Sequence, residues 1–194
     1  MEKAEPEAEK GKKPSKTNGF AVNCYEWIEA LITSLIIVVL LFSFSVRIVS
    51  VSGPSMLPNL RSGDRILLFS GFYKPRQDDV VVITHTQGLS EPIIKRVIAL
   101  ENQTVNIDFQ SGTVIVDGKR LDESRYIQNG ITKQPSDYQF PLTVPKGCVF
   151  VLGDNRLVSN DSRSRDVGMV DQRFILGKAE WVLYPFDRFG KVNS

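Results

Sequence analysis

The sequence is poor in the residues from which metal sites and histidine-dependent active sites are built. Its 194 residues include two cysteines, Cys24 and Cys148, and a single histidine, His85. No CxxC or HExxH spacing occurs, so a closed structural zinc site is excluded and we expect neither a metal nor a cofactor. The 24 Lys and Arg residues nearly balance the 22 Asp and Glu residues, for a net charge of +2. Without a basic excess, we expect no nucleic-acid partner.

One long apolar block near the start of the chain is the most prominent feature present. Residues 30–46 contain no charge, glycine or proline and are bounded by Glu29 and Arg47. As a helix, this block would extend roughly 25 Å, slightly less than the ~30 Å hydrocarbon layer of a bilayer. Trp27 and Arg47 suit the two membrane interfaces and would complete the span. We therefore predict a transmembrane signal anchor over residues 27–47.

A buried core helix and a cleaved secretory signal are the alternatives for this block. A core helix should carry a polar stripe, but the stretch LIIVVLLF is apolar all round. A cleaved signal needs small residues at the cleavage site, and residues 44–49 contain no A-x-A-like pair. An uncleaved anchor is the better interpretation.

The flanking segments give the expected domain organisation. Residues 1–26 are predicted to be a polar, largely disordered cytoplasmic tail, because Glu, Lys and Pro dominate their first part. The positive charges before the anchor only slightly favour this orientation over the reverse. The rest, 48–194, would be an extracytoplasmic domain of a single-pass cell-membrane protein. The two cysteines would then lie on opposite sides of the membrane, and whether Cys24 is acylated stays open.

Beyond the anchor, short β-branched runs alternate with turn sequences. The runs are IVSV, RILLF, VVVIT, IIKRVIAL, TVNID, TVIVDG, CVFVLGD and KAEWVLYP. Turn pairs such as Ser111-Gly112 and Asp117-Gly118 favour hairpins over βαβ units. The predicted fold is mostly β: an antiparallel β-sheet domain after one N-terminal transmembrane helix, with an irregular excursion near residues 119–145.

Two segments of this domain place polar groups where a β fold gains nothing from them. In residues 53–60 (GPSMLPNL), two prolines and a glycine impose a rigid turn that presents the Ser55 hydroxyl, although a plain connecting turn would look the same. In residues 91–100 (EPIIKRVIAL), Lys95 and Arg96 fall on opposite faces of a strand that is otherwise apolar on both faces. Such a strand is either buried, with both cations paired or functional, or an edge strand with two solvated cations. A desolvated Lys95 would lose its charge more readily and could act as a general base.

A third segment, residues 153–166 (GDNRLVSNDSRSRD), collects hydroxyls, acids and arginines after a strand. A solvated surface loop is one interpretation. The alternative is a charge network in which two acids neutralise and orient two arginines, the residues concerned being Asp154, Asp161, Arg96 and Arg163.

Together these segments resemble the type I signal peptidases, the membrane-bound serine proteases that remove signal peptides from exported proteins. The motifs SGPSMLPNL, RSGDRILL, IIKRVIAL and GDNRLVSNDSRSRDVGMV follow the anchor in the family's order. The resemblance implies that Ser55 is the nucleophile, Lys95 the general base and Ser159 the residue that orients the lysine amine. It also implies that Asp154 with Arg96, and Asp161 with Arg163, are structural ion pairs.

The resemblance extends to the reaction and its partners. It implies an acyl transfer without metal or cofactor, with the Ser55 backbone N–H in the oxyanion hole. Some family members place a serine two residues before the nucleophile; Gly53 stands there in this chain, as in the Gram-positive subgroup, so a second donor is not identified. The implied partners are signal peptides of secretory precursors with small residues one and three positions before the cut, the lipid bilayer, and a nearby export translocon.

Three other functions remain as alternatives. A Ser-His-Asp hydrolase would have to use His85, but no GxSxG motif accompanies it. Self-cleaving repressor-type peptidases share the Ser-Lys chemistry but are soluble and carry a DNA-binding module that this sequence lacks. A catalytically silent membrane-anchored binding protein would have no reason to keep both Ser55 and Lys95. The sequence gives no indication of the oligomeric state.

Overall fold

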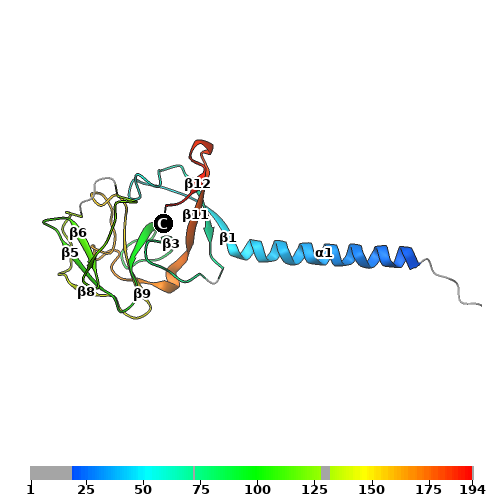
Figure 1. Ribbon diagram of the computed structural model, residues 1–194, viewed down its shortest axis with the longest axis horizontal. Helices are drawn as coiled ribbons and strands as arrows, with labels where there is room; N and C mark the ends of the chain where they lie inside the picture. The colour runs from blue at the N-terminus through cyan, green and yellow to red at the C-terminus, as the bar shows by residue number, and fades with distance from the viewer. Residues whose placement is uncertain (1–18, 72, 128–131, 194) are drawn as a thin grey trace, which may run out of the picture. The chain divides into compact units, whose positions relative to one another are not determined.

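The computed structural model describes residues 19–71, 73–127 and 132–193. Most of the predicted N-terminal tail therefore lies outside the described residues. The chain divides into two units, residues 1–41 and 42–194. The described part begins with one helix, α1 (Gly19–Ser45) (Figure 1). This helix starts inside the segment predicted as tail, because no glycine or proline follows Gly19 to interrupt backbone hydrogen bonding before the helix ends.

Helix α1 has the length and composition of a membrane span. Its 27 residues correspond to about 40 Å. The window Asn23–Leu40 has a mean hydropathy of 1.5 and none of it is buried. Among the described helices, only α1 is long and apolar enough to cross a membrane. Large apolar side chains such as Trp27 (78% exposed) and Leu31 (66%) would be unfavourable in water over so long a surface.

The described residues that follow α1 contain two antiparallel sheets. The larger sheet has the strand order β1-β2-β11-β3-β4-β9-β10, with β12 paired to β11. Its strands are β1 (Val46–Ser50), β2 (Arg65–Phe69), β3 (Val80–Ile83), β4 (Ile93–Ala99), β9 (Cys148–Leu152), β10 (Val170–Asp171), β11 (Ile175–Tyr184) and β12 (Gly190–Lys191). Two 3-10 turns, η1 (Gln172–Phe174) and η2 (Phe186–Arg188), flank β11. The antiparallel β domain predicted from the sequence is confirmed.

The smaller sheet has the order β7-β6-β5-β8. Figure 1 shows β5, β6 and β8 gathered apart from β3, β11 and β12. Its strands are β5 (Thr104–Asp108), β6 (Thr113–Val116), β7 (Lys119–Arg120) and β8 (Leu142–Thr143). The two short strands β7 and β8 are the ends of the predicted excursion. Between them, the described residues 121–127 and 132–141 contain turns and no helix or strand.

Strand β4 lies in the middle of the larger sheet, between β3 and β9. Its residues pair with both neighbours, so that Lys95 lies opposite Val81 and Arg96 opposite Leu152, and the pairing with β9 shifts register after Val97. The next residues, Val97, Ile98 and Ala99, are completely buried in two hydrophobic clusters. This central position excludes the alternative of an edge strand with two solvated cations.

Replacing Ile98 by alanine should destabilise the domain, because this fully buried side chain belongs to the cluster between β4, β9 and the smaller sheet. A large-to-small change in a packed core costs about 2–5 kcal/mol. Thermal or urea unfolding of detergent-solubilised protein measures this loss. The same substitution at Ile48, which is 63% exposed on β1, is the control and should change stability by less than about 0.5 kcal/mol. Equal effects at the two positions would contradict the described core.

Candidate active site

The loop after β1 fixes the position of the Ser55 hydroxyl. Gly53 has a φ of +84°, a left-handed conformation that a residue with a Cβ adopts only under strain. On the other side of Ser55, the side chain of Met56 is 1% exposed and anchors the loop in the hydrophobic core. A backbone hydrogen bond of 2.9 Å from the Leu60 N–H to the Met56 carbonyl closes the turn. Ser55 itself stays half-buried at the turn.

Lys95 reaches this hydroxyl from the middle of β4. Its Nζ donates a 3.0 Å hydrogen bond to Ser55 Oγ, and the residue is only 3% exposed. The two residues are 40 positions apart in the chain. The distance is within the range required of a nucleophile and its base.

Burial sets the protonation of this amine. Removal from water lowers the pKa of Lys95 from 10.5 to about 8, although the negative charges of Asp161 and Asp154 partly oppose the shift. Near neutral pH a useful fraction of the amine is therefore uncharged. An uncharged amine can accept the proton of a hydroxyl, whereas an ammonium group cannot.

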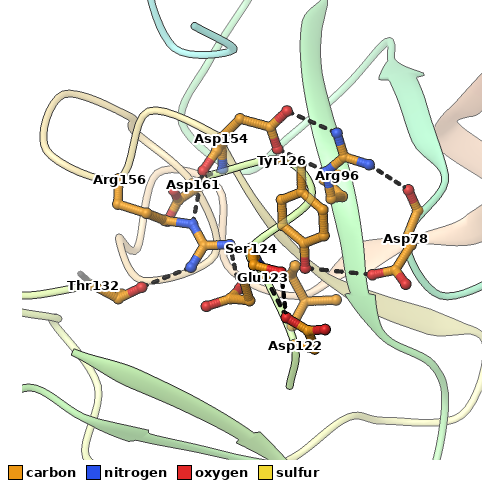
Figure 2. Close-up of polar contacts among 12 residues, drawn as sticks. Asp78, Arg96, Asp122, Glu123, Ser124, Tyr126, Thr132, Asp154, Arg156 and Asp161 are labelled. Carbon is orange, nitrogen blue, oxygen red and sulfur yellow. Dashed lines mark hydrogen bonds and ion pairs between the residues drawn. The ribbon is translucent and has the colours of Figure 1, made fainter. Parts of the chain in front are cut away.

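Arg96, the next residue on β4, is paired on the opposite face of the strand. Its Nε and Nη2 donate hydrogen bonds of 2.7 and 2.8 Å to the two carboxylate oxygens of Asp154 (Figure 2). Both side chains are completely buried. A buried arginine keeps its charge, and a buried charge without a partner is strongly destabilising. The bidentate contact with the Asp154 carboxylate compensates the Arg96 charge.

A second ion pair lies within the loop after β9. Arg163 Nε and Nη2 donate to the two oxygens of Asp161 at 2.8 and 2.9 Å. Asp161 also accepts a 3.1 Å hydrogen bond from the Gly153 N–H, which fixes the start of the loop. The structure thus brings together both acid–arginine pairs named from the sequence.

Ser159 differs from the expectation. Its hydroxyl is buried but has no hydrogen-bond partner within the described residues, so the expected bond to the Lys95 amine is not formed. The hydroxyl packs against Gly153: a Cβ added to that glycine would lie 2.2 Å from Ser159 Oγ and 2.6 Å from the Ser55 carbonyl oxygen. Gly153 is therefore the residue that lets this loop approach the Ser55 turn so closely.

An open groove of about 530 Å³ leads to Ser55 and Lys95. It is lined by residues 49–53, 55–56, 82 and 88–95. His85 is not among them; it is exposed, and its ring packs at 5.6 Å from that of Phe174. In the described ranges, no three His, Cys, Asp or Glu residues cluster as metal ligands would. The arrangement can therefore activate a hydroxyl with an amine, and it offers no role to the histidine.

Comparison with known proteins agrees with this geometry. The family model described as signal peptidase, peptidase S26, matches residues 24–184. The chain belongs to this family. It is 36% identical over 180 residues to a probable signal peptidase I-1 of Synechocystis, covering 87% of each chain. It is 30% identical over 181 residues to signal peptidase I of Bacillus licheniformis, covering 87% of this chain and 93% of the relative.

A crystal structure of a signal peptidase I from Enterococcus faecalis V583 is 28% identical, with a TM-score of 0.45; the match covers 56% of this chain and 98% of that one. The relatives are serine peptidases, so this signal peptidase family member is a hydrolase of peptide bonds. The family assignment made from the four motifs is confirmed.

Three polar residues around the candidate site were not singled out from the sequence, although each lies in a motif that was. Asn155 donates from its backbone N–H to the Ser55 carbonyl at 2.9 Å and from its side chain to the Pro54 carbonyl at 3.2 Å. Arg156 is buried and donates to the Gly153 carbonyl at 2.9 Å. Asn59, on the turn that carries Ser55, donates to Asp154 at 2.7 Å. The sequence signal that could have identified them is their position inside motifs already selected as charged or turn-forming.

Substituting Asp154 by asparagine should destabilise the peptidase domain strongly, because it leaves the buried Arg96 charge unpaired. Breaking one side of a buried pair costs about 3–5 kcal/mol. Asp171→Asn is the matched control, since Asp171 pairs with an arginine that is 83% exposed and should contribute about 0–1 kcal/mol. Urea unfolding followed by tryptophan fluorescence measures both. A loss below about 1 kcal/mol for Asp154→Asn would contradict the pairing.

Proposed function

We propose that this protein is a membrane-bound serine endopeptidase that removes N-terminal signal peptides from exported precursor proteins, with Ser55 as nucleophile and Lys95 as general base. The family supports the substrate class, since the relatives are signal peptidases. The observation that carries the mechanism is the 3.0 Å contact between the buried Lys95 amine and the Ser55 hydroxyl. No cofactor is required by this chemistry.

The reaction proceeds by two acyl transfers. Ser55 Oγ attacks the scissile carbonyl while Lys95 Nζ takes its proton, and Lys95 then gives that proton to the leaving amine as the peptide bond breaks. Water, deprotonated by Lys95, hydrolyses the acyl-enzyme and restores the hydroxyl. The Ser55 backbone N–H stabilises the oxyanion, with Gly53 offering no side-chain donor to assist it.

The groove beside the dyad fits an extended peptide. It runs along residues 49–53, which follow and include the end of β1, and along residues 88–95, which lead into β4. Strand β1 pairs with β2 alone in the described sheet, so its other edge can accept a peptide as an added strand. A signal-peptide end with small residues before the cut would lie there with its scissile carbonyl at Ser55.

Helix α1 would anchor the enzyme in the cell membrane. Its exposed apolar surface and its length suit a single span, with the tail in the cytoplasm and the catalytic domain outside. This arrangement would place the dyad on the face of the membrane where precursors emerge from the export translocon.

Cleavage of a secretory precursor with an A-x-A site tests the proposal. Ser55→Ala and Lys95→Ala should each lower kcat/KM by at least ~10⁴-fold, because each removes one partner of the dyad. The cut is mapped by mass spectrometry using detergent-solubilised protein. Ser111→Ala and Lys119→Ala, which change exposed residues in the β5–β6 turn and on β7, are the matched controls and should retain full activity.

A folded wild-type protein that leaves the precursor intact would favour the binding-protein alternative. Full activity of Lys95→Ala would keep the peptidase but remove the assigned base.

The pH dependence of kcat/KM should follow the Lys95 amine. Since only the uncharged form accepts the Ser55 proton, activity should rise about tenfold per pH unit below the pKa of about 8 and level off above it. Initial rates between pH 5.5 and 9.5 give the curve, and returning samples to pH 8 checks for irreversible unfolding. A rate that is flat between pH 6 and 8 would exclude Lys95 as the base.

A further inference from the structure

The ion pair between Arg96 and Asp154 is part of a larger closed ring of contacts. The carboxylate of Asp154 also accepts a 2.7 Å hydrogen bond from the Asn59 side chain. The same Asn59 amide donates a second 2.7 Å bond to the backbone carbonyl of Tyr126. Tyr126 completes the ring, because its aromatic side chain lies over the Arg96 guanidinium with 4.1 Å between Cζ and the ring centroid (Figure 2).

This ring joins four separate parts of the chain. Asn59 belongs to the turn that carries Ser55, and Arg96 follows Lys95 on β4. Asp154 is the second residue of the loop after β9, and the backbone N–H of its neighbour Asn155 donates to the Ser55 carbonyl at 2.9 Å. Tyr126 comes from the excursion between β7 and β8. No sequence pattern indicated a function for this excursion, and the contact between Ser55 and Lys95 does not involve it. The four contacts therefore connect the turn that carries Ser55 to the strand that carries Lys95.

Tyr126 satisfies a specific physical need of Arg96. The edge of the guanidinium is occupied by Asp154 and by Nη1 hydrogen bonds to the carbonyls of Asp78 (2.7 Å) and Asn193 (2.9 Å). Hydrogen bonds leave the flat faces of a guanidinium uncovered, and an aromatic ring attracts the cation and excludes water there. Tyr126 is itself only 3% exposed. Its hydroxyl makes a long 3.4 Å contact with Asp78, so the ring is the main contributor.

We propose that Asn59 and Tyr126 are positioning residues for catalysis, holding the Ser55 turn in register with Lys95 through the Arg96–Asp154 pair. This proposal rests on the function proposed above, because it takes the Ser55–Lys95 contact to be the catalytic one. Neither residue lines the groove that leads to the dyad. Their loss should therefore displace Ser55 from Lys95 without altering the surface that binds substrate, and a displacement of about 1 Å can reduce rates by up to ~10²-fold.

Steady-state kinetics of full-length, detergent-solubilised variants tests this role. Tyr126→Leu and Asn59→Ala should lower kcat between roughly 10- and 100-fold while KM stays within about twofold. Tyr126→Phe keeps the ring and should retain at least half of the wild-type kcat. Asn106→Ala, on β5 of the smaller sheet, is the control for the asparagine and should behave as wild type. All assays are run well below each variant's melting temperature, with near-UV circular dichroism to verify the fold.

Different failures have different meanings. A folded Tyr126→Leu or Asn59→Ala variant with wild-type kcat, or one in which KM alone rises, would overturn the positioning role. Equal loss of kcat in Tyr126→Phe and Tyr126→Leu would also overturn the positioning role, because the contact of the aromatic ring with Arg96 would then not account for the effect. Ser55→Ala is assayed in parallel: if it cleaves the precursor normally, the proposed dyad itself is wrong. If it is inactive while Tyr126→Leu is fully active, only the positioning role fails.

Discussion

Two adjacent cations, Lys95 and Arg96, are buried in the central strand of the larger sheet, and the protein interior must accommodate both. The two side chains can respond differently. Arginine keeps its proton under all ordinary conditions, so Arg96 needs a carboxylate, two backbone carbonyls and the Tyr126 ring around it. A lysine amine can give up its proton when water is removed, and the Ser55 hydroxyl is its hydrogen-bond partner. One buried strand thus holds a permanent charge that is paired with Asp154 and a removable charge beside Ser55, the proposed nucleophile.

The loop after β9 supplies the acidic residues that interact with both cations. Its Asp154 neutralises Arg96, and its Asp161 moderates the fall in the Lys95 pKa while pairing with Arg163. The close approach of Gly153 to the Ser55 carbonyl leaves no room for a larger residue. The loop is therefore a support that touches the nucleophile turn and the surroundings of the base at the same time.

In the proposed mechanism, the buried Lys95 takes the part that a histidine has in many serine peptidases. An imidazole titrates near neutral pH by itself, whereas an amine must be desolvated to do so. Burial of this kind is obtained from the middle of a sheet more readily than from an exposed loop. Ser55, the proposed nucleophile, lies by contrast on a turn that lines an open groove. The fold separates these two requirements between β4 and the loop after β1.

The sequence by itself determined the helix, the antiparallel strands and the family, and it singled out Ser55, Lys95, Asp154 and Arg96 as candidate site residues. These follow from local patterns: hydrophobic periodicity, turn residues and charged residues in apolar runs. The tertiary structure alone decided that Ser159 packs against Gly153 without reaching Lys95, and that Asn59 and Tyr126 complete the ring around Arg96. Asn59 and Tyr126 are 67 positions apart in the chain, and their contact exists only in the folded domain. Contacts of this kind depend on three-dimensional register, which no local pattern in the sequence encodes.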